Sequence, residues 1–161
     1  KFFKMDLLCQ LAFIGSEALL QNTHFLEKYP KENIAILLSN SSASLDTDKK
    51  YQETIVKEDA YFPSPSVFVY TLPSIMCGEI AIRNGIQGEN NFIISDGFAA
   101  KMLVQQASLL FAQTETKACI AGWVQLEGQQ YELLLFLVEN VASGKSSAIS
   151  LSTDSLMSMY V

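Results

Sequence analysis

The chain has 161 residues, 49% of them hydrophobic, and it carries 11 basic against 17 acidic side chains, a formal net charge of −6. That length and apolar content predict one compact domain over residues 1–161 and exclude a disordered chain. Because the balance is acidic and no basic cluster stands out beyond Lys49 and Lys50, we expect neither nucleic acid nor a membrane as a partner.

The beginning of the chain predicts a helix, a buried strand and a second helix. Apolar residues recur at spacings of three and four over residues 6–22, with Asp6 as a plausible N-cap. Residues 34–38 are continuously apolar, which is typical of a strand covered on both faces of a parallel sheet. The polar residues 39–48 predict a solvated loop, and a helix is expected over residues 47–55.

The middle of the chain predicts two further helices around a short strand. Residues 66–84 have a helical apolar pattern, but Pro73 falls inside it and predicts a kink or break. Residues 92–94 form the next apolar run and are expected to be a strand. A helix is expected over residues 97–113.

The end of the predicted sheet is a hairpin. Residues 118–126 and 131–138 are two strand-like runs, joined by a Gly-containing turn over residues 127–130. No structure is predicted for the serine-rich residues 141–161. Strands that alternate with helices and then end in a hairpin predict a layered α/β domain, with a mixed five-stranded sheet flanked by helices.

The residues that ligate metals or form disulfides are few. Cys9, Cys77 and Cys119 are odd in number, widely spaced and set in apolar surroundings, so they predict buried thiols rather than disulfides or ligands. His24 is the only histidine, and it is expected to be solvated. With a single histidine, the chain has almost no candidate ligands for a zinc site. The serines of residues 39–44 lack the glycines of a phosphate-binding loop. We therefore expect no metal and no cofactor.

The start of the chain carries no targeting signal that we identify. Residues 1–6 have a basic flank but no cleavage site, and their apolar residues continue into the first helix, so we expect a truncated beginning rather than a signal peptide. No segment approaches the roughly 18 uninterrupted apolar residues of a membrane span. With its free thiols, the chain is expected in the reducing cytoplasm.

One segment has the outline of a nucleophile elbow without a nucleophile. Gly88 and the following residues lead through an apolar strand to Ser95-Asp96-Gly97-Phe98, then to a helical run, and a second strand reaches Ala121-Gly122. This order resembles that of β-ketoacyl synthases of the thiolase fold. In that family a Gly-Pro-Asn start leads to Thr-Ala-Cys, and the second strand ends in Ala-Gly-Gly. When this sequence is aligned with the family pattern without a gap, Ser95 corresponds to the Thr, Asp96 to the Ala and Gly97 to the acylated cysteine.

Further segments carry the same resemblance. Phe3-Lys4-Met5-Asp6 is similar to the family's entry to its first helix, and the prolines of residues 63–73 with Gly78 to Ile82 and Gly85 resemble the segment before the elbow strand. Together these segments cover roughly residues 2–139 and resemble the N-terminal half of a synthase. Nothing in this sequence corresponds to the C-terminal half, which carries the family's two histidines, or His and Asn.

The replaced cysteine leaves two interpretations of the elbow. In the family the cysteine heads a helix, whose dipole lowers its pKa and whose N–H groups form an oxyanion hole. Gly97 cannot act as a nucleophile, so it either serves only a tight turn and close packing or keeps a pocket for an acyl group. Asp96 is either an ordinary N-cap or a reactive carboxylate at a helix N-terminus. We assign no catalytic residue, and we treat Ser95, Asp96, Gly97 and Phe98 as a vestigial elbow.

The resemblance implies a half-length, thiolase-fold protein of fatty acid, polyketide or aryl polyene type biosynthesis. The first hypothesis is a non-catalytic partner subunit, like the chain-length factors that shape a neighbouring synthase's acyl pocket. The alternatives are an enzyme that handles acyl thioesters and a stand-alone acyl-binding module. Family members dimerise through the strand before the elbow, here residues 91–95 with Asn91 and Ser95 at the ends. That strand predicts a homodimer, or a heterodimer with a full ketosynthase, and acyl carrier protein is a further candidate partner.

Overall fold

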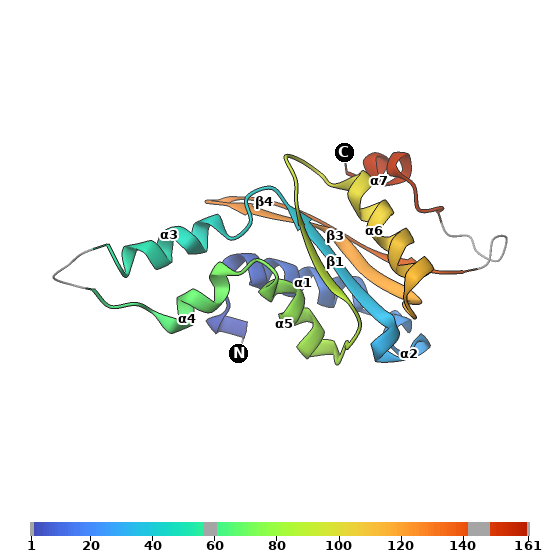
Figure 1. Ribbon diagram of the computed structural model, residues 1–161, viewed down its shortest axis with the longest axis horizontal. Helices are drawn as coiled ribbons and strands as arrows, with labels where there is room; N and C mark the ends of the chain where they lie inside the picture. The colour runs from blue at the N-terminus through green and yellow to red at the C-terminus, as the bar shows by residue number, and fades with distance from the viewer. Residues whose placement is uncertain (1, 57–60, 142–148, 161) are drawn as a thin grey trace.

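The computed structural model describes residues 2–56, 61–141 and 149–160, which form one four-stranded sheet with helices on both faces (Figure 1). The strands are β1 (Ile34–Asn40), β2 (Asn90–Ile94), β3 (Ala118–Glu127) and β4 (Gln130–Glu139). The helices, with 3-10 turns marked η, are η1 (Phe2–Lys4), α1 (Leu7–Leu20), α2 (Phe25–Lys28), η2 (Lys31–Asn33), α3 (Leu45–Glu53), α4 (Pro65–Phe68), η4 (Val69–Thr71), α5 (Ile75–Asn84), α6 (Ala100–Gln113) and α7 (Thr153–Met159).

The sheet is mixed, with strand order β2-β1-β3-β4. β1 is parallel to β2 and to β3, so that Leu38 lies beside Phe92 on one side and Gly122 on the other. All seven residues of β1 are buried, as predicted for an apolar run covered on both faces of a parallel sheet. β3 and β4 form the predicted antiparallel hairpin, whose turn holds Gly128 at a φ of 62°.

The expected fold class, a layered and mixed α/β half-domain flanked by helices, is confirmed, but the expected number of strands is wrong. Within residues 2–56, 61–141 and 149–160 the sheet has four strands rather than five. The sequence itself contains only four apolar runs with strand character, and each of them became one strand. No further apolar segment was therefore available to form the expected fifth strand.

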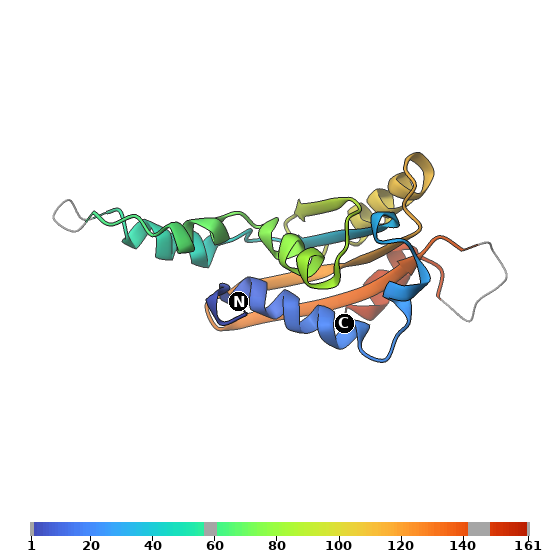
Figure 2. The ribbon, with the colours of Figure 1, turned by 90° about the horizontal axis from the view of Figure 1, so that it is seen from below.

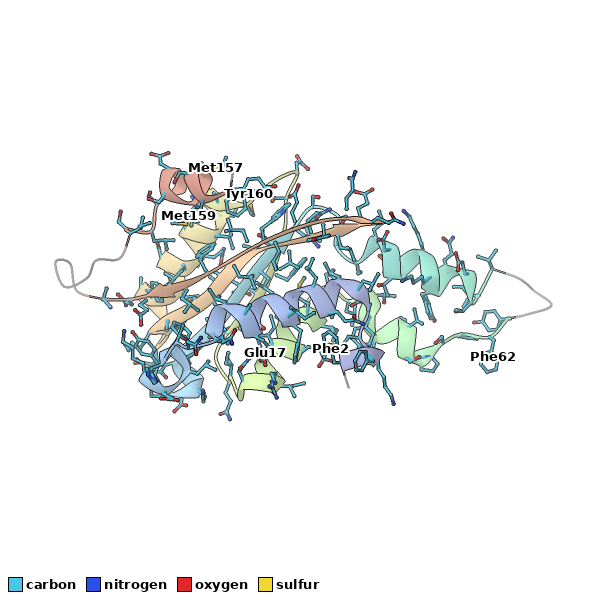
Figure 3. The ribbon with its side chains drawn as sticks, turned by 180° about the vertical axis from the view of Figure 1, so that it is seen from behind. Phe2, Glu17, Phe62, Met157, Met159 and Tyr160 are labelled. Atoms are coloured by element: carbon cyan, nitrogen blue, oxygen red, sulfur yellow. The ribbon has the colours of Figure 1, made fainter. Side chains whose placement is uncertain are left out.

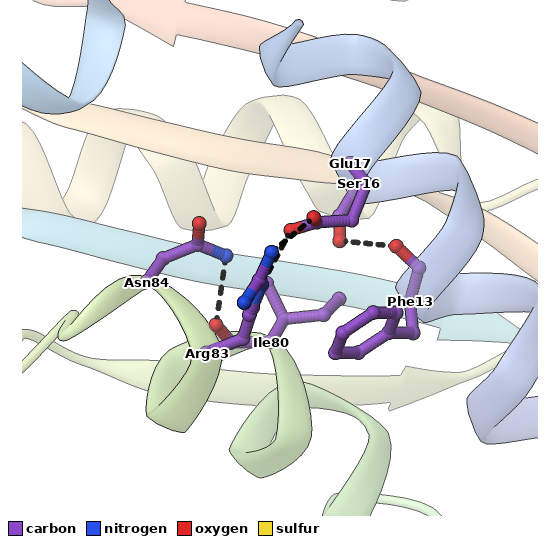
Figure 4. A network of polar contacts seen from close by, with 6 residues as sticks. All are labelled: Phe13, Ser16, Glu17, Ile80, Arg83 and Asn84. Atoms are coloured by element: carbon purple, nitrogen blue, oxygen red, sulfur yellow. Dashed lines mark hydrogen bonds and ion pairs between the residues drawn. The ribbon is translucent and has the colours of Figure 1, made fainter. Parts of the chain in front are cut away.

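One face of the sheet is covered by α1 and α5 (Figure 2). Asp6 caps α1 as predicted, because its carboxylate accepts the Cys9 backbone N–H at 2.9 Å. The two helices are joined at their surface by Arg83, which donates to both carboxylate oxygens of Glu17 at 3.1 and 2.9 Å (Figure 4). Ile36 and other β-branched or leucine side chains of the strands fill the space beneath these helices.

The segment after β1 differs from its prediction. β1 continues to Asn40, so the loop expected over residues 39–48 contains only residues 41–44 before α3 begins at Leu45. The Asn40 side chain closes this short loop, because it accepts the Ala43 backbone N–H and donates to the Ala43 carbonyl, both at 2.9 Å. Ser39 is consequently buried in the strand, where its hydroxyl donates to the Gly122 carbonyl at 2.9 Å.

The predicted break at Pro73 is confirmed. Pro73 lies between η4 and α5, which begins only at Ile75. Figures 1 and 2 show α3 and α4 projecting from the sheet as an arm. No single helix in the described ranges is long and apolar enough to cross a membrane, although Pro65–Thr71 and α5 together reach that length and composition across a 98° bend.

The last helix was not predicted. α7 forms within residues 141–161, for which no structure was predicted, and Ser152 caps it by accepting the Ser155 N–H at 3.1 Å. Residues 142–148 and 161 of that stretch lie outside the described residues. α7 packs against α6 on the face of the sheet opposite α1 (Figure 1).

Candidate functional site: an elbow without a nucleophile

The elbow lies between the end of β2 and the start of α6. The Ser95 backbone N–H donates to the Asn40 carbonyl at 3.0 Å, and the Ser95 hydroxyl donates to the Gly97 carbonyl at 2.5 Å. Asp96 and Gly97 are exposed, whereas Ala99 and Ala100 are buried against the sheet. The elbow is therefore a short surface loop that is anchored at both ends.

The helix after the elbow begins later than predicted. α6 starts at Ala100, and its N-cap is Ala99 rather than Asp96. The two alanines pack into the apolar cluster of this face, and this packing fixes where the helix begins, while Ser95 and Gly97 are held in their own turn. The Asp96 carboxylate accordingly lacks the position at a helix N-terminus that would make it an N-cap or a stabilised anion.

Gly97 is not required by the backbone or by packing. A Cβ built on Gly97 meets no atom within 4 Å, and the residue is not in the left-handed region of φ. Close packing at this position therefore does not require glycine, and the second interpretation, a pocket for an acyl group, stays a prediction. Gly122, by contrast, is needed for close approach, because a Cβ there would collide with the Leu134 carbonyl oxygen of the neighbouring strand.

Three aromatic rings gather beside the elbow. Phe98 stacks on Tyr160 with ring centres 4.4 Å apart and an interplanar angle of 20°. Trp123 meets both rings edge to face, with centres 6.1 Å from Phe98 and 6.4 Å from Tyr160. This aromatic cluster, Phe98, Trp123 and Tyr160, joins the elbow, β3 and the end of α7.

Glu132 on β4 ties the aromatic cluster together. The Trp123 indole N–H donates to Glu132 Oε2 at 2.9 Å, and the Tyr160 hydroxyl donates to the same oxygen at 2.5 Å. The hydrogen bond to Glu132, followed by burial, raises the pKa of Tyr160 to about 12, so its phenol is protonated at neutral pH. A pocket of about 250 Å³ opens between this group and the elbow, bordered by Asp96 and Gly97.

Sequence reasoning found the elbow but not the residues that face it. Trp123 is the chain's only tryptophan and directly follows Ala121-Gly122, where the synthase pattern has a second glycine. That replacement was a signal available in the sequence. Glu132 and Tyr160 had no such signal, because Tyr160 lies in the stretch without a predicted structure and Glu132 is one of many exposed acids.

None of the three thiols of the chain lies in the elbow. Cys9, Cys77 and Cys119 are all free and buried, as predicted. Burial raises the pKa of Cys77 and of Cys119 to about 12, and burial followed by the charge of Asp6 raises the pKa of Cys9 further. A thiol needs to ionise to act as a nucleophile, so these three side chains are inert at neutral pH.

His24 does not line the elbow pocket. It is exposed at the start of α2, as expected for a solvated histidine, with Nδ1 3.1 Å from Glu27 Oε2. In the part of the chain that the structure describes, no group of three or more His, Cys, Asp or Glu side chains is placed to hold a metal ion.

The fold is that of proteins of ketosynthase and chain length factor complexes. Over 76% of its length the chain matches the structure titled "The ishigamide ketosynthase/chain length factor", with a TM-score of 0.65 and 19% identity. Over 78% it matches a chain of the structure titled "Ketosynthase (ApeO) in Complex with its Chain Length Factor (ApeC) from Xenorhabdus doucetiae", with a TM-score of 0.56 and 13% identity. The chain spans 35% and 48% of the lengths of these two matched chains. No protein-family model and no curated protein matches the sequence.

Proposed function

We propose that this chain is a non-catalytic, ketosynthase-like subunit that pairs with a full ketosynthase and shapes the partner's acyl pocket. The observation that carries the proposal is Gly97, which falls at the nucleophile's place when the sequence is aligned with the ketosynthase pattern, and which is exposed and meets no atom that would require a glycine. The titles of both similar structures name a ketosynthase with a chain length factor. Its participation in biosynthesis of the fatty acid, polyketide or aryl polyene type remains a prediction, and so does its location in the cytoplasm.

The edge of the sheet supports the proposed pairing. Among the residues that the structure describes, β2 pairs only with β1, so it is an edge strand of this sheet. The Glu89 carbonyl accepts the Ile36 N–H and the Ser95 N–H donates to Asn40, so alternate residues of this segment face β1. The backbone groups of Asn90, Phe92 and Ile94 consequently point outward, and Ile94 is 56% exposed. An uncovered edge with an apolar end is a template for pairing with another strand.

The pairing is tested by two substitutions at one position. Ile94→Pro removes an outward N–H without removing a bond to β1, whereas Ile94→Ala removes the apolar side chain and keeps that N–H. Each tagged variant is co-expressed with a complete ketosynthase of the same host and purified. We expect the unmodified chain and Ile94→Ala to retain the ketosynthase and Ile94→Pro to lose it.

The controls separate folding from pairing. Circular dichroism and thermal unfolding of Ile94→Pro should match those of the unmodified chain, since the β1 ladder is intact. Retention of the ketosynthase by a folded Ile94→Pro would refute pairing through β2. Light scattering of the chain alone distinguishes a homodimer from a subunit that associates only with the synthase.

The two alternatives, an enzyme acting on acyl thioesters and a stand-alone acyl-binding module, make different predictions. Hydrolysis of an acyl thioester that disappears in Asp96→Ala would support the enzyme. Binding of a fatty acid by the unmodified, unpaired chain would support the module. Acyl carrier protein stays a candidate partner, and its docking requires basic residues, of which Lys49 and Lys50 in α3 are the exposed pair.

A further inference from the structure

α6 carries apolar side chains on the side that faces solvent as well as on the side that faces the sheet. Its buried residues are Ala100, Leu103, Ala107 and Leu110. On the outer side Met102 is 42% exposed and Leu109 is 45% exposed, even though α7 packs against this helix. A surface helix normally has polar and charged residues on the side opposite the core, so the outer side of α6 is unusual for a helix that meets only water.

The outer side of α6 is also nearly without charge. From Ala100 to Gln113 the only charged residue is Lys101. The exposed residues of α3, by contrast, include Asp48, Lys49 and Glu53. Few charges around exposed apolar side chains distinguish the centre of a protein–protein interface from the rest of a protein surface.

α7 has exposed apolar side chains of its own beside α6. The two helices pack against each other on one face of the sheet (Figure 1). Met157 is 48% exposed and Met159 is 39% exposed, and Figure 3 labels both on the outer part of the molecule. Both helices of this face therefore present apolar side chains to solvent.

The exposed residues of α6 have the spacing of a short coiled-coil seam. They follow one another at intervals of three, four and three residues: Met102, Gln105, Leu109 and Ala112. This is the spacing of the positions called a and d, which pack against a second helix. Gln105 is the one polar member of this seam. The outer side of α6 is therefore patterned for a second helix that lies along it.

Opposite charges stand at the two ends of the seam. Lys101 is exposed at the start of α6, and the Glu115 side chain, just beyond its end, is 90% exposed, with its Oε2 3.7 Å from Lys117 Nζ. Lys101, Ser108 and Glu115 are seven residues apart, at the positions called g that flank the seam. A second α6 in antiparallel orientation would bring each Lys101 to Glu115 of the second copy, whereas a parallel one would bring the two lysines together.

The antiparallel arrangement also matches large side chains with small ones. It places Met102 opposite Ala112 of the second copy, and Gln105 opposite Leu109 of the second copy. In a two-fold contact each of these pairs occurs twice, because the same surface is used by both partners. The surface is therefore complementary to itself in side-chain size and in charge.

We propose that α6 is a surface through which two copies of this chain associate, with their α6 helices antiparallel about a two-fold axis near Ser108. This association goes beyond the proposed function, because it uses a face of the sheet rather than the β2 edge and does not involve a ketosynthase. Two helices of this length bury a small area, so the association is weak and the chain is monomeric in dilute solution.

The first test is sedimentation equilibrium up to a chain concentration of about 1 mM, at which even a weak dimer forms. Leu109→Lys places a charge in the seam and should leave the chain monomeric. Ile82→Lys is the matched control, because Ile82 is 71% exposed on α5, on the other face of the sheet. The unmodified chain and Ile82→Lys should dimerise equally, and circular dichroism should show that all three are folded.

The second test exchanges the charges at the ends of the seam. Lys101→Glu and Glu115→Lys each replace two attractions by two repulsions, and each should weaken the dimer by about tenfold. The double variant restores opposite charges and should regain the affinity of the unmodified chain. Equal weakening in the double variant would contradict the antiparallel arrangement.

The third test links the two copies chemically. Ser108→Cys places the two new thiols about 3 Å apart along the helix axes, whereas Gln113→Cys, on the same helix, places them about 18 Å apart. A short bismaleimide should link Ser108→Cys into dimers and leave Gln113→Cys unlinked, as read by intact mass.

Two results would overturn the proposal. One is an unmodified chain that is monomeric at every concentration. The other is a dimer that a folded Leu109→Lys retains; if Ile94→Pro then abolishes that dimer, the copies pair through β2 instead. Retention of a ketosynthase is a separate readout, so the association through α6 and the proposed pairing fail separately.

Discussion

The two faces of the sheet are packed with side chains of different size. Beneath α1 and α5 the strands place bulky residues, among them Ile34, Ile36 and Ile120. Beneath α6 they place small ones, among them Ala35 and Ala121, and these meet the alanines of α6. Small side chains allow the helix after the elbow to lie close to the sheet, and three rings, those of Phe98, Trp123 and Tyr160, gather beside the elbow.

The two faces also differ in whether the elbow lies on them. The face beneath α1 and α5 is an ordinary apolar core, closed at its surface by Arg83 and Glu17. The face beneath α6 carries the elbow and the aromatic cluster. The free energy of unfolding should therefore fall most when side-chain volume is removed from the first face, and when volume is added to the second.

The largest expected effect is on the face beneath α1 and α5. Ile36 is completely buried there, so Ile36→Ala should lower the free energy of unfolding by about 4 kcal/mol, through lost transfer energy and the cavity that is left. Urea unfolding measures the change. Ile82→Ala on the exposed side of α5 is the control, and a surface substitution of this kind should change stability by less than about 1 kcal/mol. Equal effects of the two substitutions would contradict the packing described for this face.

The face beneath α6 should respond to added volume instead. Ala107 of α6 is buried at its contact with the sheet, so Ala107→Leu should destabilise the protein by about 2 kcal/mol through overpacking. Ala112→Leu places the same side chain on an exposed position of α6 and should be nearly neutral. Urea unfolding of both variants separates packing from helix propensity. A neutral Ala107→Leu would show that α6 does not lie closely on the sheet.

A smaller effect is expected from the pH dependence of Tyr160. Its pKa rises from 10.0 to about 12 on folding, so the protonated phenol stabilises the folded chain. This contribution is fully present below pH 10 and is lost as the pH rises from 10 towards 12. The difference in free energy of unfolding between the unmodified chain and Tyr160→Phe should therefore narrow over that range. A difference that stays constant up to pH 12 would show that the hydrogen bond to Glu132 does not form.

The smallest effect on stability is expected at Gly97. Since a Cβ there meets nothing, Gly97→Cys should leave the free energy of unfolding within about 0.5 kcal/mol of its original value. It should also introduce a thiol that iodoacetamide labels at pH 8 in the folded protein, while the three buried native thiols react only after unfolding in guanidinium. Mass spectrometry counts the labels. A destabilised variant, or labelling of native thiols in the folded state, would contradict the account of this region.

The sequence predicted those parts of the structure that local patterns determine. The apolar runs became β1, β2, β3 and β4, Asp6 capped α1, and Pro73 separated η4 from α5. The start of α6 was misplaced because Gly97 resembles a family landmark, whereas the helix begins where Ala99 and Ala100 pack on the sheet.

The residues that lie opposite the elbow are brought there by contacts between segments that are distant in the sequence. Tyr160 meets Phe98 and Glu132 across long stretches of chain, and α7 is a short, serine-rich helix whose one core residue is Leu156. Isolated helices of this length are not stable by their own propensity, so their formation depends on tertiary packing. A pattern read along the chain therefore could not find α7 or the aromatic cluster.

The most direct test of the central claim is the intact mass of the purified chain after incubation with acyl carrier protein thioesters, with a complete ketosynthase as positive control. An elbow that lacks a nucleophile predicts an unchanged mass for this chain while the ketosynthase gains the acyl group. An acyl adduct on this chain, mapped by peptide sequencing to Ser95, Asp96 or a cysteine, would contradict the non-catalytic account.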